Sequence, residues 1–466
     1  MKQTPNTVIQ WFKQPYAVIL NFLQRLNSRT SKISVTQATI IPRDEHPISR
    51  KIISRPALDV LYGLKEAGYE AYLVGGCLRD ALTGTTPKDF DVVTNAKPEE
   101  IQRTFRRARI IGRRFRLVHV YFGREAIEVA TFRSNTEDAD PKRLVQSKSG
   151  QLLRDNVFGT IEEDAQRRDF TINALYYNIA NFALYDFANA LQDIEARTVR
   201  LIGDPETRYR EDPVRMLRAI RFAAKLNFTI ERDTAAAIKP LAHLLKEVPP
   251  ARLFDESNKL FLSGYGKNTF KLLNEYHLFK QLFPSAYRYL DNSPSHYPLL
   301  ALALQNTDIR ITDGRPVTPA FLLAVFLWPQ VVEQQRAKIN NGMPPVVAMT
   351  QATSEAISEQ VSAIAIPKRF SLMMREIWEL QERLPRRHGQ RAARLVTHPR
   401  FRAAYDFLLL REQAGEIPPG LGQWWTDYQD ADHKQRETMV KALNPHGSKR
   451  SPRRRSRKKK PSNAQQ

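Results

Sequence analysis

The chain has 466 residues, of which 42% are hydrophobic and 26% are charged, an ordinary composition for a folded globular protein. At about 150 residues per domain this length suggests about three domains and disfavours a single-domain protein. Lysine and arginine number 72 against 49 acidic residues, a formal net charge of +23. That excess favours a polyanionic partner and carries no information on the fold.

Cysteine usage and hydropathy narrow the expected class of protein. Cys77 is the only cysteine, so the sequence excludes an intrachain disulfide and a structural zinc site built from several cysteines. We expect a reducing, cytoplasmic compartment for such a chain. No apolar run approaches the about 18 residues that a membrane span needs, so we expect no transmembrane segment.

The composition and the hydrophobic pattern change along the chain, and these changes predict five parts. Apolar residues between Trp11 and Phe22 could line one side of an N-terminal helix, which we expect to dock on the protein. A weak anchor at a membrane surface is the alternative. The expected parts are an extension over residues 1–47, a head over 48–180, a neck over 181–265, a helical body over 266–445 and a basic tail over 446–466.

Residues 48–180 mix helical periodicity with short apolar runs, which predicts a small mixed sheet with helices packed on it. Ser54 and Pro56 are typical of a helix start, and Gly68 is typical of its end. The elements predicted after that helix are a strand at Ala71–Val74, a helix at Cys77–Leu82, a strand at Lys88–Val93, a helix at Glu99–Arg107 and strands at Leu117–Phe122 and Ala126–Phe132.

From about Pro205 onward no strand pattern is recognisable, and helical spacing dominates. The helices predicted there span Pro213–Leu226, Thr234–Leu245, Pro250–Leu262 and Ile366–Leu384. We therefore predict an α+β fold, in which a small mixed β-sheet head precedes an all-α neck and body. The low-complexity basic tail should be disordered.

Two aspartates in the head carry the strongest chemical signal. On a strand, Asp89 and Asp91 would project from the same face, with Phe90 buried behind them. Neighbouring carboxylates repel each other unless a positive group lies between them. Mg²⁺ prefers such hard oxygen ligands, and two metal ions can support phosphoryl transfer. Taken alone, this spacing is more often surface charge or turn chemistry.

Gly75 and Gly76 follow a predicted strand and open the next helix. Glycine lets a ligand approach the backbone closely, and the N–H groups at a helix start favour an anion. Arg79 and Asp80 come one turn later. Together with the two aspartates, this order predicts a phosphate-binding turn beside a metal site.

A third carboxylate usually completes such a site, and two residues are candidates. Glu128 is an acid inside an apolar strand, although it could simply face solvent. Asp169 follows two arginines and could complete the set or orient the arginines and the nucleotide sugar. The sequence leaves the choice between Glu128 and Asp169 open.

Several segments match a known family in order. Leu73–Asp80 with Lys88–Asp91 resembles the first motif of the class II nucleotidyltransferases, which include tRNA CCA-adding enzymes and bacterial poly(A) polymerases. Arg167–Ala174 resembles the second motif, which is associated with the ribose. Glu211–Phe222 is similar to the nucleobase-recognition helix, and Ala251–Glu256 is similar to the neck helix that follows it.

Within this group the poly(A) polymerase I branch resembles the chain best. The segments Ile41–His46 and Asp155–Asp164 and the arginine-rich C-terminus are similar to that branch. A CCA-adding tRNA nucleotidyltransferase, which is usually shorter and has no such tail, is the first alternative. A non-catalytic RNA-binding protein on the same scaffold is the second.

The resemblance implies an activity and a site. An RNA 3′-hydroxyl would attack the α-phosphate of ATP and release pyrophosphate, with two Mg²⁺ ions as cofactors. Asp89 and Asp91 would hold the metals and act in catalysis, and Glu128 or Asp169 would complete the set. Asp80 would orient Arg79 toward the triphosphate. The residues implied in nucleotide binding are Gly75, Gly76, Arg79, Asp80, Arg168, Asn173, Asp212, Arg215 and Arg218.

The distribution of positive charge fits RNA 3′ ends, rather than DNA, as the partner that the resemblance implies. Residues 449–460 hold nine cations and no acid, which favours salt-dependent contact with RNA phosphates regardless of sequence. Further arginines cluster over 103–116 and 386–402. Because polyadenylation of bacterial RNA is expected to promote decay, the RNA-degradation machinery is a candidate partner.

Overall fold

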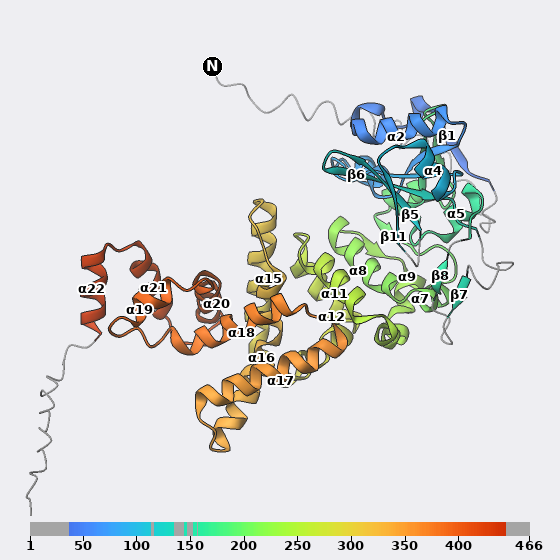
Figure 1. Ribbon diagram of the computed structural model, residues 1–466. Helices are drawn as coiled ribbons and strands as arrows, with labels where there is room; N and C mark the ends of the chain where they lie inside the picture. The colour runs from blue at the N-terminus through green and yellow to red at the C-terminus, as the bar shows by residue number, and fades with distance from the viewer. Residues whose placement is uncertain (1–36, 113–115, 135–143, 147–151, 156, 444–466) are drawn as a thin grey trace, which may run out of the picture. The chain divides into compact units, whose positions relative to one another are not determined.

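The computed structural model describes residues 37–112, 116–134, 144–146, 152–155 and 157–443 (Figure 1). The helix expected between Trp11 and Phe22 and the basic tail therefore lie outside the described residues. The chain forms two compact units. The first unit holds the chain up to Arg288 with residues 304–317 and 358–366, and the second unit holds residues 289–303, 318–357 and those from 367 on. The expected head and neck both belong to the first unit, and the expected body is shared between the two.

The head is built on an eight-stranded sheet with the strand order β1-β10-β9-β2-β3-β6-β5-β4. β3 and β6 are parallel, and the other neighbouring strands of this sheet are antiparallel. A separate hairpin pairs β7 with β8. The strands span Thr39–Ile41 (β1), Ala71–Val74 (β2), Asp91–Thr94 (β3), Ala108–Ile111 (β4), Leu117–Phe122 (β5), Glu125–Thr131 (β6), Leu144–Gln146 (β7), Leu152–Asp155 (β8), Leu175–Asn178 (β9) and Leu184–Asp186 (β10).

Two predictions about the sheet differ from the structure. The strand expected from Lys88 begins at Asp91, because β2 ends at Val74, which pairs with Asp91. Asp89 therefore lies in the loop before the strand and not on it. Residues placed in the N-terminal extension form β1, which pairs with β10 and buries Ile41 in the head core. The folded head thus begins before residue 48.

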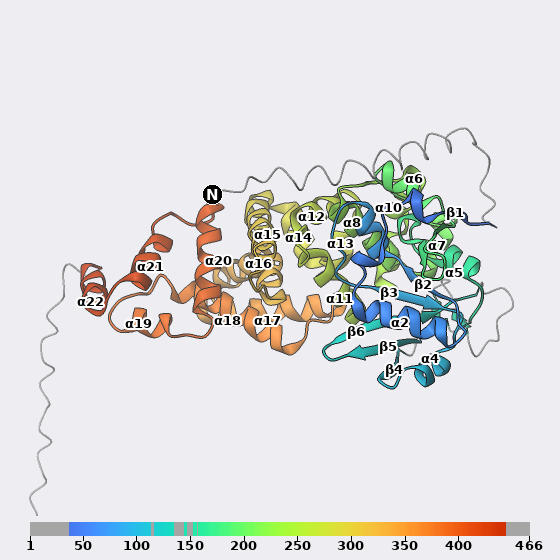
Figure 2. The same cartoon turned by 90° about the horizontal axis from the view of Figure 1, so that it is seen from above.

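One face of the sheet packs against α2 (Arg55–Glu66) and α4 (Pro98–Thr104), as Figure 2 shows. The start of α2 is confirmed, since Ser54 Oγ accepts the N–H of Ala57 at 3.3 Å. Leu61 and Leu64 of α2 are fully buried against Val129 of β6 and its neighbours. Helical spacing in the sequence thus located the helix that closes this face.

The opposite face of the sheet has a smaller apolar cluster. Val74, Val93 and Tyr176 from β2, β3 and β9 pack there with Phe132 and with Ala165 of α5 (Ile161–Arg167). This cluster covers the strands on one side of the β3–β6 pair. It therefore supports the backbone on which Asp91 stands.

The neck joins the head through α7 (Pro205–Glu211), α8 (Val214–Leu226) and α11 (Pro250–Phe261). α8 buries Met216 and Ile220 on one side, as the sequence pattern predicts, and its arginines line another side. It ends at Asn227, whose φ of 53° is left-handed. The left-handed residue redirects the chain out of the helix.

Two features of the neck were not predicted. β12 (Thr229–Ile230) pairs in parallel with β11 (Thr198–Val199), and two-residue strands leave no periodic signal in a sequence. The helix predicted at Thr234–Leu245 is divided into α9 (Arg232–Ala236), α10 (Ile238–Leu241) and a 3₁₀ turn. Pro240 accounts for the division, because proline has no N–H to donate to the carbonyl four residues before it.

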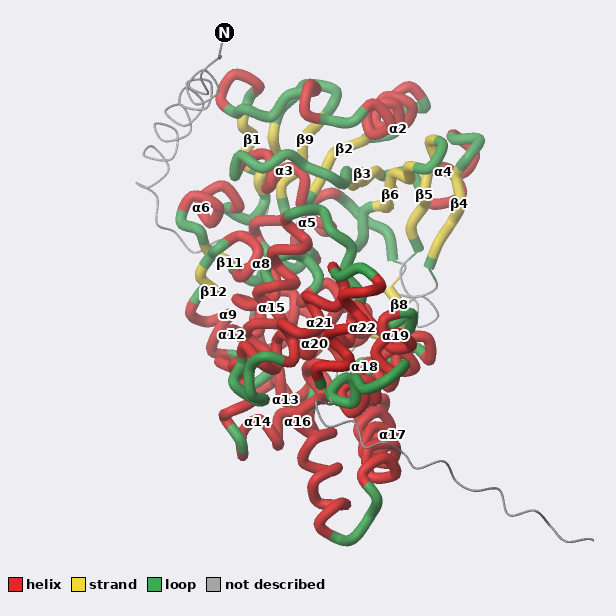
Figure 3. Tube along the Cα trace, turned by 90° about the vertical axis from the view of Figure 1, so that its left-hand side faces the viewer, coloured by secondary structure: helices red, strands yellow, loops and turns green. Residues whose placement is uncertain are grey.

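The remaining described structure is helical (Figure 3). In the second unit, Trp378 donates its Nε1–H to the Ala324 carbonyl at 3.1 Å, and Trp425 donates to the Leu384 carbonyl at 3.2 Å. None of the helices in the described part of the chain is long and apolar enough to cross a membrane. These helices span Gly76–Leu82 (α3), Ala190–Glu195 (α6), Gly266–Glu275 (α12), Phe279–Leu282 (α13), Pro284–Asn292 (α14), Tyr297–Thr312 (α15), Pro319–Asn340 (α16), Pro345–Ala363 (α17), Lys368–Arg383 (α18), Arg391–Val396 (α19), Phe401–Gln413 (α20), Leu421–Asp430 (α21) and His433–Ala442 (α22).

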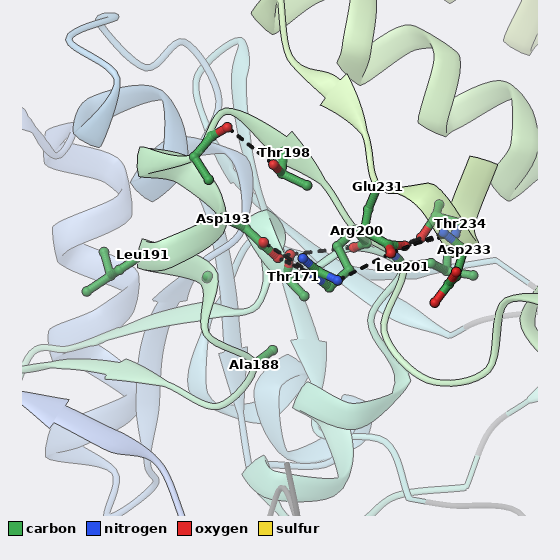
Figure 4. Close-up of polar contacts among 12 residues, drawn as sticks. Thr171, Ala188, Leu191, Asp193, Thr198, Arg200, Leu201, Glu231, Asp233 and Thr234 are labelled. Atoms are coloured by element: carbon green, nitrogen blue, oxygen red, sulfur yellow. Dashed lines mark hydrogen bonds and ion pairs between the residues drawn. The ribbon is translucent and has the colours of Figure 1, made fainter. Parts of the chain in front are cut away.

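A polar cluster ties the segment after Asp169 to the start of the neck (Figure 4). Thr171 donates its Oγ1–H to Asp193 at 2.6 Å, and Arg200 donates its Nε–H to both oxygens of Asp193 at 3.2 and 3.1 Å. Arg200 also forms an ion pair with Glu231, with 3.6 Å between Nη1 and Oε1. Asp193 is only 4% exposed, so its carboxylate depends on these donors.

We expect Asp193→Ala to lower the free energy of unfolding by about 2 kcal/mol, because it removes the carboxylate that accepts from the buried Thr171 hydroxyl and pairs with Arg200. Urea unfolding of the full chain measures this change. The matched control is Asp233→Ala, which removes an exposed aspartate from the same cluster and should change the value by less than about 0.5 kcal/mol. An equal loss in both variants would contradict the role given to Asp193.

Candidate active site

Two carboxylates face each other across the β3–β6 pair. The parallel register sets Asp91 directly opposite Glu128, and both side chains reach solvent. Their Cα atoms thus lie about one strand spacing apart, about 4.8 Å. The pairing brings together residues that are 37 positions apart in the sequence, which no local pattern could have revealed.

The electrostatics of Asp91 reflect this arrangement. The side chain reaches solvent at the wall of a cavity, yet protein atoms surround most of it, and this burial raises the pKa of Asp91 to about 6. The neighbouring charges of Glu128 and Asp89 raise the pKa further, while Arg168 lowers it. A nearby cation would relieve the repulsion between the carboxylates.

The structure therefore supports the predicted metal site only in part. Asp91 and Glu128 supply adjacent hard oxygen donors, which fit a divalent cation such as Mg²⁺. Within the described residues, however, no three His, Cys, Asp or Glu side chains gather closely enough to form a complete metal site. Asp89, in the loop before β3, contributes charge to Asp91 without completing such a group.

Asp169 is held by cationic and amide donors. Arg218 donates its Nε–H to Asp169 Oδ2 at 2.6 Å, and Asn173 donates its amide to Oδ1 at 3.1 Å. The backbone N–H of Phe170 reaches Oδ1 at 2.8 Å. Burial alone would raise the pKa of Asp169, but Arg218 and these hydrogen bonds outweigh it and lower the pKa to about 2. Asp169 is thus ionised and oriented toward the neck.

Arg168 is fixed beside the glycine turn. Its Nη2–H bonds Asp164 Oδ2 at 3.0 Å, and its Nε–H bonds the Tyr176 hydroxyl at 2.8 Å. Gly75 has φ of +80°, and a side chain built there would meet Arg168 at 3.8 Å. A glycine is required at position 75 because other residues rarely adopt this conformation.

Arg79 lies behind this turn. Its guanidinium is 3% exposed and donates to Asn173 Oδ1 at 2.5 Å and, through Nε, to Asp80 Oδ1 at 2.9 Å. It also stands 5.1 Å from the centre of the Phe222 ring. The other oxygen of Asp80 accepts a hydrogen bond from Lys225 of α8 at 3.2 Å. Arg79 and Asp80 therefore connect the glycine turn to the neck.

The side chains of Asp212 and Arg215, both implied in nucleotide binding, bond to other residues rather than to each other. Arg252 of α11 donates to both oxygens of Asp212, at 2.8 and 2.7 Å. Arg215 donates to Glu211 at 2.7 Å and to the Arg208 carbonyl at 2.8 Å. Asp212 is the residue that ends α7, so its position relative to α8 depends on the turn between the two helices.

These residues surround a cavity of about 380 Å³. It brings together Asp91 and Glu128 from the sheet with arginines from the segment before Thr171 and from α8. Among the described residues, its lining does not include Asp89, Gly75, Gly76, Arg79, Asp80 or Asn173. The lining residues named in the sequence analysis are Asp91, Glu128, Arg168, Asp169, Asp212, Arg215 and Arg218.

Two lining residues, Arg252 and Glu256, were quoted as part of a motif but not predicted as site residues. They lie four positions apart on α11 and so share a face of that helix. Their spacing could have suggested a joint role with Asp212. Arg133, Asp164 and Arg167 also line the cavity. Asp164 and Arg167 belong to segments that resemble the family but were not predicted as site residues, and nothing in the local sequence pattern distinguished Arg133.

Comparisons with known proteins agree along the whole chain. The family described as "Poly A polymerase head domain" matches residues 71–200. "Probable RNA and SrmB- binding site of polymerase A" matches residues 227–290, and "Polymerase A arginine-rich C-terminus" matches residues 341–460. The three matches follow one another in chain order.

The relatives separate the two branches of the group. Poly(A) polymerase I of Salmonella typhi is 48% identical over 95% of this chain and 98% of its own length. The CCA-adding enzyme of Bacillus subtilis is 34% identical, but over 53% of this chain and 60% of its own. The solved Thermotoga maritima CCA-adding enzyme complexed with tRNA shares the fold, with a TM-score of 0.55, 20% identity and coverage of 88% of this chain and 99% of that one. Because the first likeness spans nearly the full length of both proteins, the chain belongs to the bacterial poly(A) polymerase I family.

Proposed function

We propose that this protein adds adenosines from ATP to RNA 3′ ends without a template. The observation that carries the proposal is the Asp91–Glu128 pair at the wall of an arginine-lined cavity. Paired carboxylates suit metal-assisted phosphoryl transfer, and the arginines suit a triphosphate. Family membership supports the choice of ATP and RNA, since the closely similar relative from Salmonella typhi is named poly(A) polymerase I.

In the proposed reaction, the oxygen of the RNA 3′-hydroxyl forms a bond with the α-phosphorus of ATP. The bond between that phosphorus and the oxygen bridging to the β-phosphate breaks, and pyrophosphate leaves while the hydroxyl proton passes to solvent. The protein forms no covalent bond, so its contribution is positioning and electrostatic stabilisation.

We propose Asp91, Glu128 and Asp89 as the residues that hold Mg²⁺. Two ions would lower the pKa of the attacking hydroxyl and neutralise charge on the phosphates. Of the two candidates for the third carboxylate, Glu128 is supported by its place opposite Asp91. Asp169 already accepts hydrogen bonds from Arg218, Asn173 and a backbone N–H, so we assign it to positioning Arg218.

We propose two roles for the arginines around the cavity. Arg168, Arg215 and Arg218 would contact the phosphates, while Arg79 and Asp80 would hold the glycine turn in place from behind. The Asp212–Arg252 pair would read the adenine edge, because its bidentate geometry leaves remaining N–H donors and carboxylate lone pairs in fixed directions. Gly75, Gly76 and Asn173 would shape the turn.

A CCA-adding activity and a non-catalytic RNA-binding role are less well supported. The CCA-adding relative matches only about half of the chain, and the paired carboxylates would serve no purpose in a scaffold that only binds RNA. We propose RNA 3′ ends as the substrate and the cytoplasm as the place of action. Nothing in the described residues favours contact with the RNA-degradation machinery or with a membrane.

Primer extension tests this function. Purified protein with Mg²⁺ is offered an unstructured RNA and a tRNA lacking its CCA end, each with ATP alone, CTP alone or both. We expect a long ladder on the unstructured RNA with ATP alone. Extension that is restricted to the tRNA, requires CTP and stops after three nucleotides would instead support the CCA-adding alternative.

Two acid-to-amide variants separate the roles of Glu128 and Asp169. We expect Glu128→Gln to lower kcat by at least about a hundred-fold, because it removes a charged ligand proposed to hold the Mg²⁺ that neutralises the reacting phosphate. Asp169→Asn should act mainly on the KM for ATP, since it loosens Arg218. Glu125→Gln, the same change three residues earlier on β6, is the matched control and should leave kcat unchanged. A full kcat effect in Asp169→Asn with none in Glu128→Gln would reverse the assignment.

The raised pKa of Asp91 gives a pH dependence with a defined sign. Between pH 3.8 and about 6 the folded chain retains a proton on Asp91 that the unfolded chain has lost, so this residue's contribution to stability falls as pH rises through that window. A metal ion competes with the same proton. Mn²⁺ affinity, followed by electron paramagnetic resonance of the free ion, should therefore fall as pH decreases through about 6. Asp91→Asn should lack this step, and a pH-independent affinity in the unaltered chain would contradict it.

A further inference from the structure

Four side chains form a continuous row across strands β4, β5, β6 and β3 of the sheet. The strand registers set Arg109 opposite His119, His119 opposite Glu128, and Glu128 opposite Asp91. Side chains at paired positions of neighbouring strands point to the same face. The row therefore runs from the edge strand β4, through β5 and β6, directly to the two carboxylates of the candidate active site.

In the described part of the chain, a helix covers one face of the β4–β5 end of the sheet. α4 packs against β4, β5 and β6 on the face where Val118, Val120 and Val129 are buried, and Figure 2 shows this helix beside β4 and β5. On the other face, Arg109 and Ile111 are exposed, and His119 and Tyr121 are half-buried. We call Arg109, Ile111, His119 and Tyr121 the β4–β5 face.

The chemistry of the β4–β5 face combines aromatic rings with positive charge. The rings of His119 and Tyr121 lie 6.1 Å apart between centroids. The Arg109 guanidinium stands 5.8 Å from the centre of the Tyr121 ring. No carboxylate of the described residues is bonded to Arg109 in an ion pair, so its charge is available to an anion. Aromatic side chains beside an unneutralised arginine are what proteins use to bind single-stranded nucleic acid.

The strand order places this face opposite the triphosphate side of the site. Arg168 bonds Tyr176 of β9 and lies next to Gly75 at the end of β2, which are both on the β2 side of β3. The β4–β5 face lies on the other side of Asp91 and Glu128. In-line phosphoryl transfer requires the attacking hydroxyl and the leaving pyrophosphate to be on opposite sides of the α-phosphate. If pyrophosphate leaves toward β2, the hydroxyl has to arrive from β5.

We propose that the β4–β5 face binds the last nucleotides of the RNA, with bases against Tyr121 and His119 and a phosphate on Arg109. The inference rests on the proposed function and specifies how the RNA strand enters its site. This binding role explains why polar and aromatic side chains lie beside the carboxylates, although apolar clusters cover the other parts of the sheet. Contacts of this kind are independent of base identity, which suits an enzyme that extends different 3′ ends.

The test compares arginines on the two faces of the same sheet region. Arg109→Ala removes the cation of the β4–β5 face, and Arg103→Ala removes an exposed cation from α4 on the covered face. We expect Arg109→Ala and Tyr121→Leu each to raise the KM for a short unstructured RNA by about ten-fold and to leave the KM for ATP unchanged. Tyr121→Phe should retain the KM of the unaltered chain. Equal RNA KM values for Arg109→Ala and Arg103→Ala would overturn the proposal.

A crosslinking experiment on the unaltered chain tests the same placement without relying on variants that could fold poorly. An RNA with 4-thiouridine at its 3′ end is irradiated in complex with the protein, and the attached peptide is identified by mass spectrometry. Attachment within residues 108–111 or 117–122 supports the proposal, and attachment elsewhere overturns it. If the unaltered chain binds RNA and crosslinks at this face but incorporates no nucleotide, the proposed function fails while the binding face stands. If the β4–β5 face instead binds another protein, no RNA crosslink forms there, and this result also overturns the proposal.

Discussion

The parallel pairing of β3 with β6 is the constraint on which the rest of the site depends. It holds Asp91 and Glu128 opposite each other, where burial and then the charge of Glu128 raise the pKa of Asp91 to about 6. The buried core under the sheet includes Val92 of β3 and Val129 of β6, so packing opposes a separation of these two strands that would relieve the repulsion between the carboxylates. The fold therefore fixes two neighbouring carboxylates at a position that favours a cation. The surrounding residues are arranged relative to this position.

Arginine and lysine residues connect the head to the neck through a few carboxylates. Arg218 of α8 bonds Asp169, and Lys225 of the same helix bonds Asp80. Arg200 bonds Asp193 within the neck, and Asp193 also accepts a hydrogen bond from Thr171 of the head. Because these pairs are half-buried, losing one partner would leave an uncompensated charge, which costs more than an exposed pair contributes. These bonds hold α8, which lines the cavity, at a fixed position relative to the glycine turn. The residues proposed to bind the nucleotide thus also fix the geometry between head and neck.

Much of the secondary structure and the family of the chain could be predicted from the sequence alone. Capping at Ser54, the apolar run at Ala71–Val74 and the spacing of Met216 and Ile220 are local signals, and local signals determine short helices and strands. Motif order was sufficient to identify the family. Predictions failed where a local pattern was interrupted, as at Pro240, or where pairing set the limit of an element, as for β3.

The amino-acid sequence by itself determined which chemical groups are present: the carboxylates, the glycine turn, the arginines and the excess positive charge. Only the tertiary structure decided which of them act together. Glu128 and Asp169 are equivalent candidates in the sequence, but strand register sets Glu128 against Asp91 and a neck helix sets Arg218 against Asp169. Likewise, Asp212 pairs with Arg252, a residue 40 positions away. The physical reason is that side chains interact through space, and the distances between remote residues are fixed by packing rather than by their order along the chain.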